Sequence, residues 1–221
     1  MDSLNYKELY DLQDKVLESV FAVEKEFYLT GGTCLNRFYH EKRYSDDLDF
    51  FTHNSGRFGF AVKIIKVKLR ENHQINTEVD SRNFIRFKVD EKLQIDFVND
   101  TAYRYKDPVI KENGIIIDTI ENILSNKLTA VIGRDNPKDI FDIYLICKFY
   151  DFNWKEIVES ARKKASFMFE DLIVRLKSFP LPLLKTIQVA DRRFLDNFEK
   201  EFPLIIEEIT KMEIHKKLIR L

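Results

Sequence analysis

Two aspartates separated by one residue, Asp47 and Asp49, are the side chains of this sequence best suited to do chemistry. In an extended strand, residues two apart share a face, so Asp47 and Asp49 project together while Leu48 and Phe50 point into the core. Neighbouring carboxylates repel each other, and Mg²⁺ relieves the repulsion because it takes one or two carboxylates plus substrate phosphates. An Asp-x-Asp pair alone is more often a solvated strand end, so a second signal is needed.

That second signal is Gly31-Gly32-Thr33, which lies upstream of the aspartates at the end of an apolar strand. Glycine lets a ligand come close to the main chain. Thr33 is expected to cap a helix over residues 33–39, whose free N–H groups would face a phosphate. A phosphate-binding turn beside a metal-binding aspartate pair is the layout for phosphoryl or nucleotidyl transfer.

Asp96 is a third candidate carboxylate. Residues 84–89 and 93–98 each alternate apolar and polar side chains, and residues 90–92 predict a hairpin turn between them. Asp96 would lie on the polar face of the second strand, where an acid needs a cation, a metal or water. It is therefore a third site carboxylate, an exposed strand acid, or an ion-pair partner of Arg86 on the preceding strand.

Both helices and strands are needed to position these residues. The hydrophobic periodicity predicts helices over residues 4–23, 33–39 and 60–72, and strands that end at Thr30 or span residues 48–51, 75–79, 84–89, 93–98 and 114–117. From residue 119 the chain reads as helical, with a helix stop at Gly133, a start at Asn136-Pro137 and breaks at residues 178–180 and 202–203. We expect an α+β fold: a mixed sheet with flanking helices over residues 1–118, and a helical region over residues 119–221 that closes the active-site cleft.

Composition places the chain among ordinary globular proteins. Of its 221 residues, 44% are hydrophobic and 33% charged, and the formal net charge of −1 gives no global signal for nucleic acid. Two distant cysteines, no signal-peptide pattern and no apolar run of membrane-spanning length predict a cytoplasmic protein without membrane contact.

The motifs carry a family resemblance. Gly31-Gly32-Thr33 followed by Arg43-x-Ser45-x-Asp47-Leu48-Asp49-Phe50 resembles the AbiEii/AbiGii nucleotidyltransferase toxins of the polymerase-beta-like superfamily. A second block, with Lys127, Arg134 and then Lys138-Asp139-x-x-Asp142 at a helix start, resembles the same family, although the family often has arginine where Lys138 stands. The resemblance covers about residues 20–150.

The resemblance implies a polymerase-beta-like core that moves a nucleoside monophosphate (NMP) from a nucleoside triphosphate (NTP) to an acceptor hydroxyl, with Mg²⁺, or Mn²⁺ in its place. It implies that three aspartates bind the metal: Asp47, Asp49 and Asp96. It assigns catalytic roles to these three and to Lys127 and Asp139. It assigns substrate binding to Gly31, Gly32, Thr33, Arg43, Ser45 and Arg134. Asp142 is expected to hold Lys127 or Arg134 in place.

For such toxins the implied acceptor is RNA, with tRNA 3′ ends as the leading class, and the implied protein partner is an antitoxin made by an adjacent gene. Two alternatives stay open: the same core acting on a small aminoglycoside-like molecule or a protein hydroxyl, and a non-catalytic nucleotide-binding module. A phosphotransferase is disfavoured because no His-x-Asp catalytic loop is found.

Overall fold

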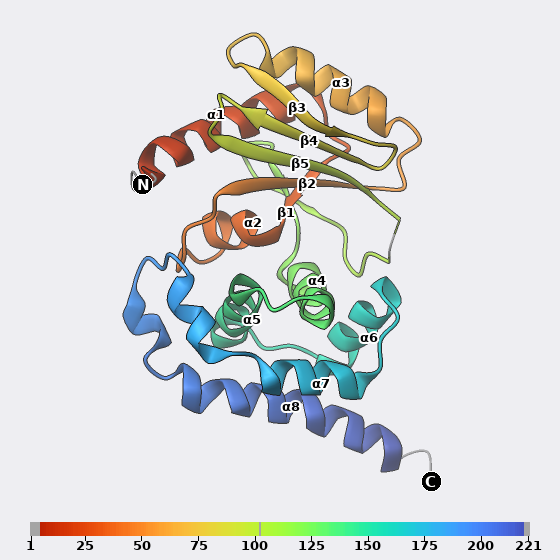
Figure 1. Ribbon diagram of the computed structural model, residues 1–221. Coiled ribbons are helices and arrows are strands. Elements are labelled where there is room, and N and C mark those ends of the chain that lie inside the picture. Colours follow the sequence, from red (N-terminus) through yellow and green to blue (C-terminus); the bar gives the residue numbers. More distant parts are fainter. Residues whose placement is uncertain (1–4, 102, 219–221) are drawn as a thin grey trace. The chain divides into compact units, whose positions relative to one another are not determined.

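The chain folds into two compact units (Figure 1). The structure is a computed structural model that describes the backbone of residues 5–101 and 103–218 and the side chains of these residues up to residue 211. A core unit comprises Met1–Tyr39, Tyr44–Thr101 and Asp107–Thr119, and a helical unit comprises His40–Arg43, Ala102–Lys106 and Ile120–Leu221.

The described strands of the core unit form one mixed sheet in the order β3-β4-β5-β2-β1-β7-β6. They are β1 (Tyr28–Thr30), β2 (Asp47–His53), β3 (Ile75–Asp80), β4 (Phe84–Val89), β5 (Leu93–Asp100), β6 (Val109–Ile110) and β7 (Ile116–Ile117). β2 pairs with β5, and β1 with β7, in parallel, while the other neighbours are antiparallel. The predicted α+β class with a mixed sheet is confirmed; β6 was not predicted, because two exposed residues carry no periodicity.

One face of this sheet is apolar and aromatic. Phe97 on β5 is fully buried, and its ring lies 5.3–5.4 Å from the rings of Phe27, Phe50 and Phe87. Helices α1 (Tyr6–Val23) and α3 (Phe58–Leu69) pack on this face through two ring contacts, Phe21 with Phe50 and Phe58 with Phe27. Because side chains alternate along each strand, the opposite face carries the polar residues of β2, β4 and β5.

The β4–β5 hairpin is tight and fixes the register of the polar face. Three residues, Asp90 to Lys92, connect the strands; Asp90 and Glu91 have positive φ, 49° and 56°, and the Lys92 N–H donates to the Val89 carbonyl oxygen at 3.0 Å. Val89 therefore pairs with Leu93, and Arg86 lies directly opposite Asp96.

The helical unit is built from α4 (Ile120–Gly133), α5 (Pro137–Phe149), α6 (Trp154–Lys164), α7 (Phe169–Ser178), α8 (Phe198–Leu218) and two 3₁₀ turns, η1 (Leu181–Thr186) and η2 (Arg192–Leu195). The predicted break after Ser178 is confirmed, but the break at Phe202-Pro203 is wrong, because Pro203 lies inside α8. Pro203 is the sixth residue of α8, where a proline removes one backbone hydrogen bond and crowds the preceding turn. Burial of Phe198, Phe202 and Ile209 on the same helix offsets this cost. None of the helices in the described part of the chain is long and apolar enough to cross a membrane.

Candidate active site

A row of four residues crosses the polar face of the core sheet. Thr30 on β1 pairs with Asp49 on β2, Asp49 pairs with Asp96 on β5, and Asp96 pairs with Arg86 on β4. Asp47 precedes Asp49 by two residues and lies on the same face, while Leu48 and Phe50 are buried on the other. The shared face predicted for Asp47 and Asp49 is confirmed.

Gly31 provides the space in which the Asp49 side chain lies. Its φ is +72°, a conformation that L side chains rarely adopt, and a Cβ built on it would overlap Oδ2 of Asp49. Helix α2 (Gly31–Phe38) begins at this glycine, so its first turn lies directly against the carboxylate of Asp49. Only glycine meets both requirements at position 31.

Thr33 does not cap α2, contrary to the prediction, because the helix begins two residues earlier and Thr30 is the N-cap residue. The Thr33 side chain is fully buried; its hydroxyl donates to the Asp47 carbonyl oxygen and lies 2.8 Å from the hydroxyl of Ser45, which is also buried. These two side chains join α2 to the start of β2, and this contact positions the backbone of Asp47.

Asp96 forms an ion pair with Arg86, one of the three interpretations that the sequence left open. Nε and a terminal nitrogen of Arg86 donate to the two oxygens of Asp96, each at 2.7 Å. Asp96 is 8% exposed and also accepts a 3.3 Å hydrogen bond from Gln94. Its roles as a metal ligand and as a catalytic group stay predictions.

The donor set of the polar face fits a divalent cation. Asp47 and Asp49 present carboxylate oxygens from one strand face, which is the ligand type that Mg²⁺ prefers. Among the described residues, however, no group of three or more His, Cys, Asp or Glu side chains is gathered in a way that could hold a metal ion. Asp47 and Asp49 are thus the residues that would hold the ion.

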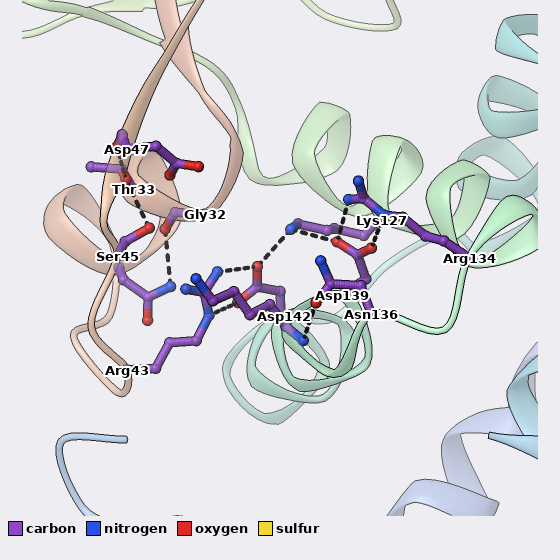
Figure 2. Close-up of polar contacts among 12 residues, drawn as sticks. Gly32, Thr33, Arg43, Ser45, Asp47, Lys127, Arg134, Asn136, Asp139 and Asp142 are labelled. Carbon is purple, nitrogen blue, oxygen red and sulfur yellow. Dashed lines mark hydrogen bonds and ion pairs between the residues drawn. The ribbon is translucent and has the colours of Figure 1, made fainter. Parts of the chain in front are cut away.

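A second cluster of predicted residues lies within the helical unit and is centred on two buried aspartates of α5 (Figure 2). Helix α5 begins at Pro137, as predicted, with Asn136 accepting a hydrogen bond from the Lys138 N–H. Asp139 therefore lies in the first turn, where a carboxylate is favoured by the helix dipole. It accepts hydrogen bonds from Lys127 at 2.9 Å and from Arg134 at 2.7 and 3.1 Å.

Asp142, one turn later on α5, binds two cations. Arg43 donates to both of its oxygens at 2.7 Å, and the Lys127 ammonium lies 2.8 Å from Oδ2. The expectation that Asp142 holds Lys127 agrees with this contact, whereas Arg134 binds Asp139 instead. Arg43 was predicted at the substrate, but it is 1% exposed and its guanidinium is engaged by Asp142, so we assign it an internal structural role.

Opposite charges determine the protonation states of this cluster. Burial alone would lower the pKa of Lys127, but Asp142 and Asp139 outweigh it and raise that pKa. Burial alone would raise the pKa of each aspartate, yet Arg43 and Lys127 hold the pKa of Asp142 below its usual value, and Lys127 and Arg134 do the same for Asp139. All five side chains are therefore charged at neutral pH, and the cluster carries one net positive charge.

Two residues that support the site were missed from the sequence. Gln13 of α1 is fully buried and donates to the Ser45 carbonyl oxygen at 3.0 Å, and the Tyr10 hydroxyl accepts from the Ser45 N–H at 3.2 Å. A signal for Gln13 was present, because it is a polar residue on the apolar face that Leu9, Val16 and Val20 define. Tyr10 gave no such signal.

The mixed sheet, the glycine turn after β1 and the aspartate pair on β2 define a nucleotidyltransferase fold. Two solved structures from Helicobacter pylori are similar to this chain in fold. JHP933 gives a TM-score of 0.59 with 20% identity over 99% of both chains. A putative nucleotidyltransferase gives 0.60 with 21% identity over 95% of this chain and 98% of that chain.

The sequence places the chain within one family. The model of the nucleotidyl transferase AbiEii toxins, of the type IV toxin–antitoxin systems, matches residues 15–213, and the chain belongs to this family. It is also similar to the uncharacterized protein aq_aa25 of Aquifex aeolicus (strain VF5), with 27% identity over 176 residues that cover 74% of this chain and 79% of that protein.

Proposed function

We propose that this toxin-family nucleotidyltransferase transfers an NMP from an NTP to a hydroxyl group of RNA, with the 3′ end of tRNA as the acceptor. Two observations together carry the proposal. Asp47 and Asp49 lie on the same face of β2, and the carboxylate of Asp49 lies against the first turn of α2. This arrangement brings two carboxylates that can bind a cation next to a helix N-terminus whose N–H groups can bind phosphate.

In the proposed reaction the acceptor oxygen attacks the α-phosphorus of the NTP. A bond forms between that oxygen and phosphorus, the bond from the α-phosphorus to the bridging oxygen breaks, and pyrophosphate leaves while the acceptor proton passes to a carboxylate or to water. A bound Mg²⁺ would supply electrostatic stabilisation of the charge on the leaving pyrophosphate. Asp47 and Asp49 are the residues that would hold it.

The chain's own residues have distinct proposed roles. The N–H groups of Gly31 and Gly32 at the start of α2 bind phosphate oxygens. Thr33 and Ser45, being buried, act by fixing the backbone of β2. We further propose that Lys127 and Arg134 contribute positive charge toward the phosphates and that Asp139 orients both of them, since it hydrogen-bonds both.

As a member of a toxin family, the chain is proposed to act in the cytoplasm and to be controlled by an antitoxin made by an adjacent gene. The test of the acceptor uses the full-length protein with each labelled NTP, Mg²⁺ and one of three acceptors: total tRNA, tRNA with an oxidised 3′-terminal ribose, or a mixture of aminoglycosides. Label on intact tRNA but not on oxidised tRNA is the expected result. Label on the aminoglycosides, or on the protein itself, would replace RNA with a small-molecule or a protein acceptor.

A further inference from the structure

Arg86 is the one cation in the row that joins the site carboxylates across the core sheet. The row runs from Arg86 through Asp96 to Asp49 on three neighbouring strands, in direct register. On antiparallel strands such as β4 and β5, residues directly opposite each other have Cβ atoms about 4.5–5.5 Å apart, so the side chains of Arg86 and Asp96 interact. Arg86 therefore belongs to the electrostatics of the site, although the family motifs do not include it.

The contact between Arg86 and Asp96 occupies both oxygens of the carboxylate. The two hydrogen bonds are 2.7 Å each and form the parallel, two-pronged geometry that makes arginine–carboxylate pairs strong. The side chain of Asp96 is 11% exposed and that of Arg86 is 33% exposed. The hydrogen bonds to Asp96 raise the pKa of Arg86, and the charges of Asp96, Glu78 and Asp49 raise it further.

The backbone fixes this pair. The two positive-φ residues of the hairpin turn, Asp90 and Glu91, set the β4–β5 register, and this register brings Arg86 opposite Asp96. A shift of one residue would turn the buried side chains of one of the two strands to the polar face. The folded hairpin thus keeps the backbone of Arg86 opposite that of Asp96, within reach of the ion pair.

We propose that Arg86 takes the place of a second metal ion in this site, so that Asp47 and Asp49 hold a single divalent cation while Asp96 is neutralised by the guanidinium. Both oxygens of Asp96 are already engaged by Arg86, which leaves Asp47 and Asp49 as the two carboxylates that would share one divalent cation. This inference deepens the proposed function and rests on it.

The test counts the Mn²⁺ ions bound to the full-length protein by isothermal titration calorimetry and by electron paramagnetic resonance of the free ion. The wild type should bind one ion per chain, and Asp49→Asn none. Arg86→Gln should bind a second ion, because Asp96 becomes available. Lys88→Gln is the matched control: Lys88 lies on the same face of β4, opposite the uncharged Gln94, and its loss should leave the count at one.

Asp96→Asn tests the inference independently if Arg86→Gln fails to fold, as judged by circular dichroism. This variant should still bind one ion, with a dissociation constant within about threefold of wild type. Loss of a residue that only supports a metal ligand already costs about 10–100-fold in metal affinity, so loss of a ligand should weaken ion binding by at least that factor. Two ions on the wild type, none on the wild type, one on a folded Arg86→Gln, or a large loss in Asp96→Asn would each overturn the inference.

The inference and the proposed function fail in different ways. Transfer of NMP by a wild type that binds two ions would leave the function standing and remove the role of Arg86. One bound ion without NMP transfer to any acceptor would support the single-cation site and contradict the proposed reaction.

Discussion

The carboxylate of Asp49 occupies the space that a side chain on Gly31 would need. This relationship joins the two signals that the sequence offered separately, the glycine turn and the aspartate pair, within the core unit. It also makes the proposed site sensitive to a single methyl group.

Gly31→Ala should destroy activity more than it destabilises the protein. The new Cβ would displace the Asp49 carboxylate, and a shift of about 1 Å at a reacting centre can cost ~100-fold in rate. The positive φ adds about 1–3 kcal/mol of backbone strain. NMP transfer and urea unfolding measure the two effects. Gly59→Ala is the control, because a Cβ there meets nothing within 4 Å; equal activity of the two variants would contradict the role of Gly31.

Lys127→Met should destabilise the protein by about 3–5 kcal/mol, because it leaves Asp139 and Asp142 with fewer counter-charges in a buried site. Its ammonium contacts both aspartates, at 2.9 and 2.8 Å. Denaturant unfolding checks this value, with Lys155→Met, an exposed lysine of α6, as the control. A loss below about 1 kcal/mol, typical of surface ion pairs, would contradict a buried network.

Arg134→Gln separates substrate binding from folding. The side chain of Arg134 is 58% exposed, so its ion pair with Asp139 should contribute no more than about 1 kcal/mol to stability. If Arg134 binds the triphosphate, the KM for the NTP should rise about tenfold, equivalent to ~1.4 kcal/mol of binding. Steady-state kinetics measure this change, with Arg162→Gln on α6 as the control variant. An unchanged KM would remove Arg134 from the substrate-binding set.

The α5 cluster predicts a dependence of stability on pH in acid. The folded-state pKa values of Asp139 and Asp142 are lowered, so their contribution is fully present above the unfolded value of about 3.9 and is lost as pH falls through the folded-state values. The pKa of Lys127 is raised, so its contribution is present below about pH 10.4 and is lost as pH rises through its folded value.

Asp142→Asn should therefore flatten the acid part of the curve of unfolding free energy against pH. Urea unfolding between about pH 2 and 5 measures the slope, which reports the difference in bound protons between the unfolded and folded states. Asp151→Asn, at an exposed position, is the control for the removal of one carboxylate. The same slope in all three proteins would show that Asp142 keeps an ordinary pKa.

Local patterns accounted for most of the core unit. Strand β4 spans Phe84–Val89 as predicted, because strict alternation and a short turn determine a hairpin locally. The face shared by Asp47 and Asp49 followed from the period of two residues. The start of α2 at Gly31 was not foreseen, because Thr33 has the residue type of a helix cap, whereas in the structure Thr30 is the N-cap residue and Thr33 lies inside the helix.

Long-range pairing was beyond the reach of the sequence. Arg43 and Asp142 are 99 residues apart, and no periodicity links a loop arginine to an aspartate on a distant helix. Arg86 and Asp96 are only 10 residues apart within one hairpin, and for this reason their ion pair could be considered in advance. The motifs identified both Arg43 and Arg134 as candidate site residues. Only the structure shows that Arg43 is buried whereas the side chain of Arg134 is exposed.

The most direct test of nucleotidyl transfer is the movement of label from an α-³²P-labelled NTP to tRNA, comparing wild type with Asp49→Ala and Asp80→Ala. Asp80 is an exposed aspartate of β3 in the same core unit and serves as the matched control. We predict label on tRNA with wild type and Asp80→Ala, and a loss of at least about 100-fold with Asp49→Ala, because this variant lacks one of the two carboxylates that would hold the cation stabilising the charge on the phosphates. Equal transfer by Asp49→Ala and wild type would contradict the site described for this chain.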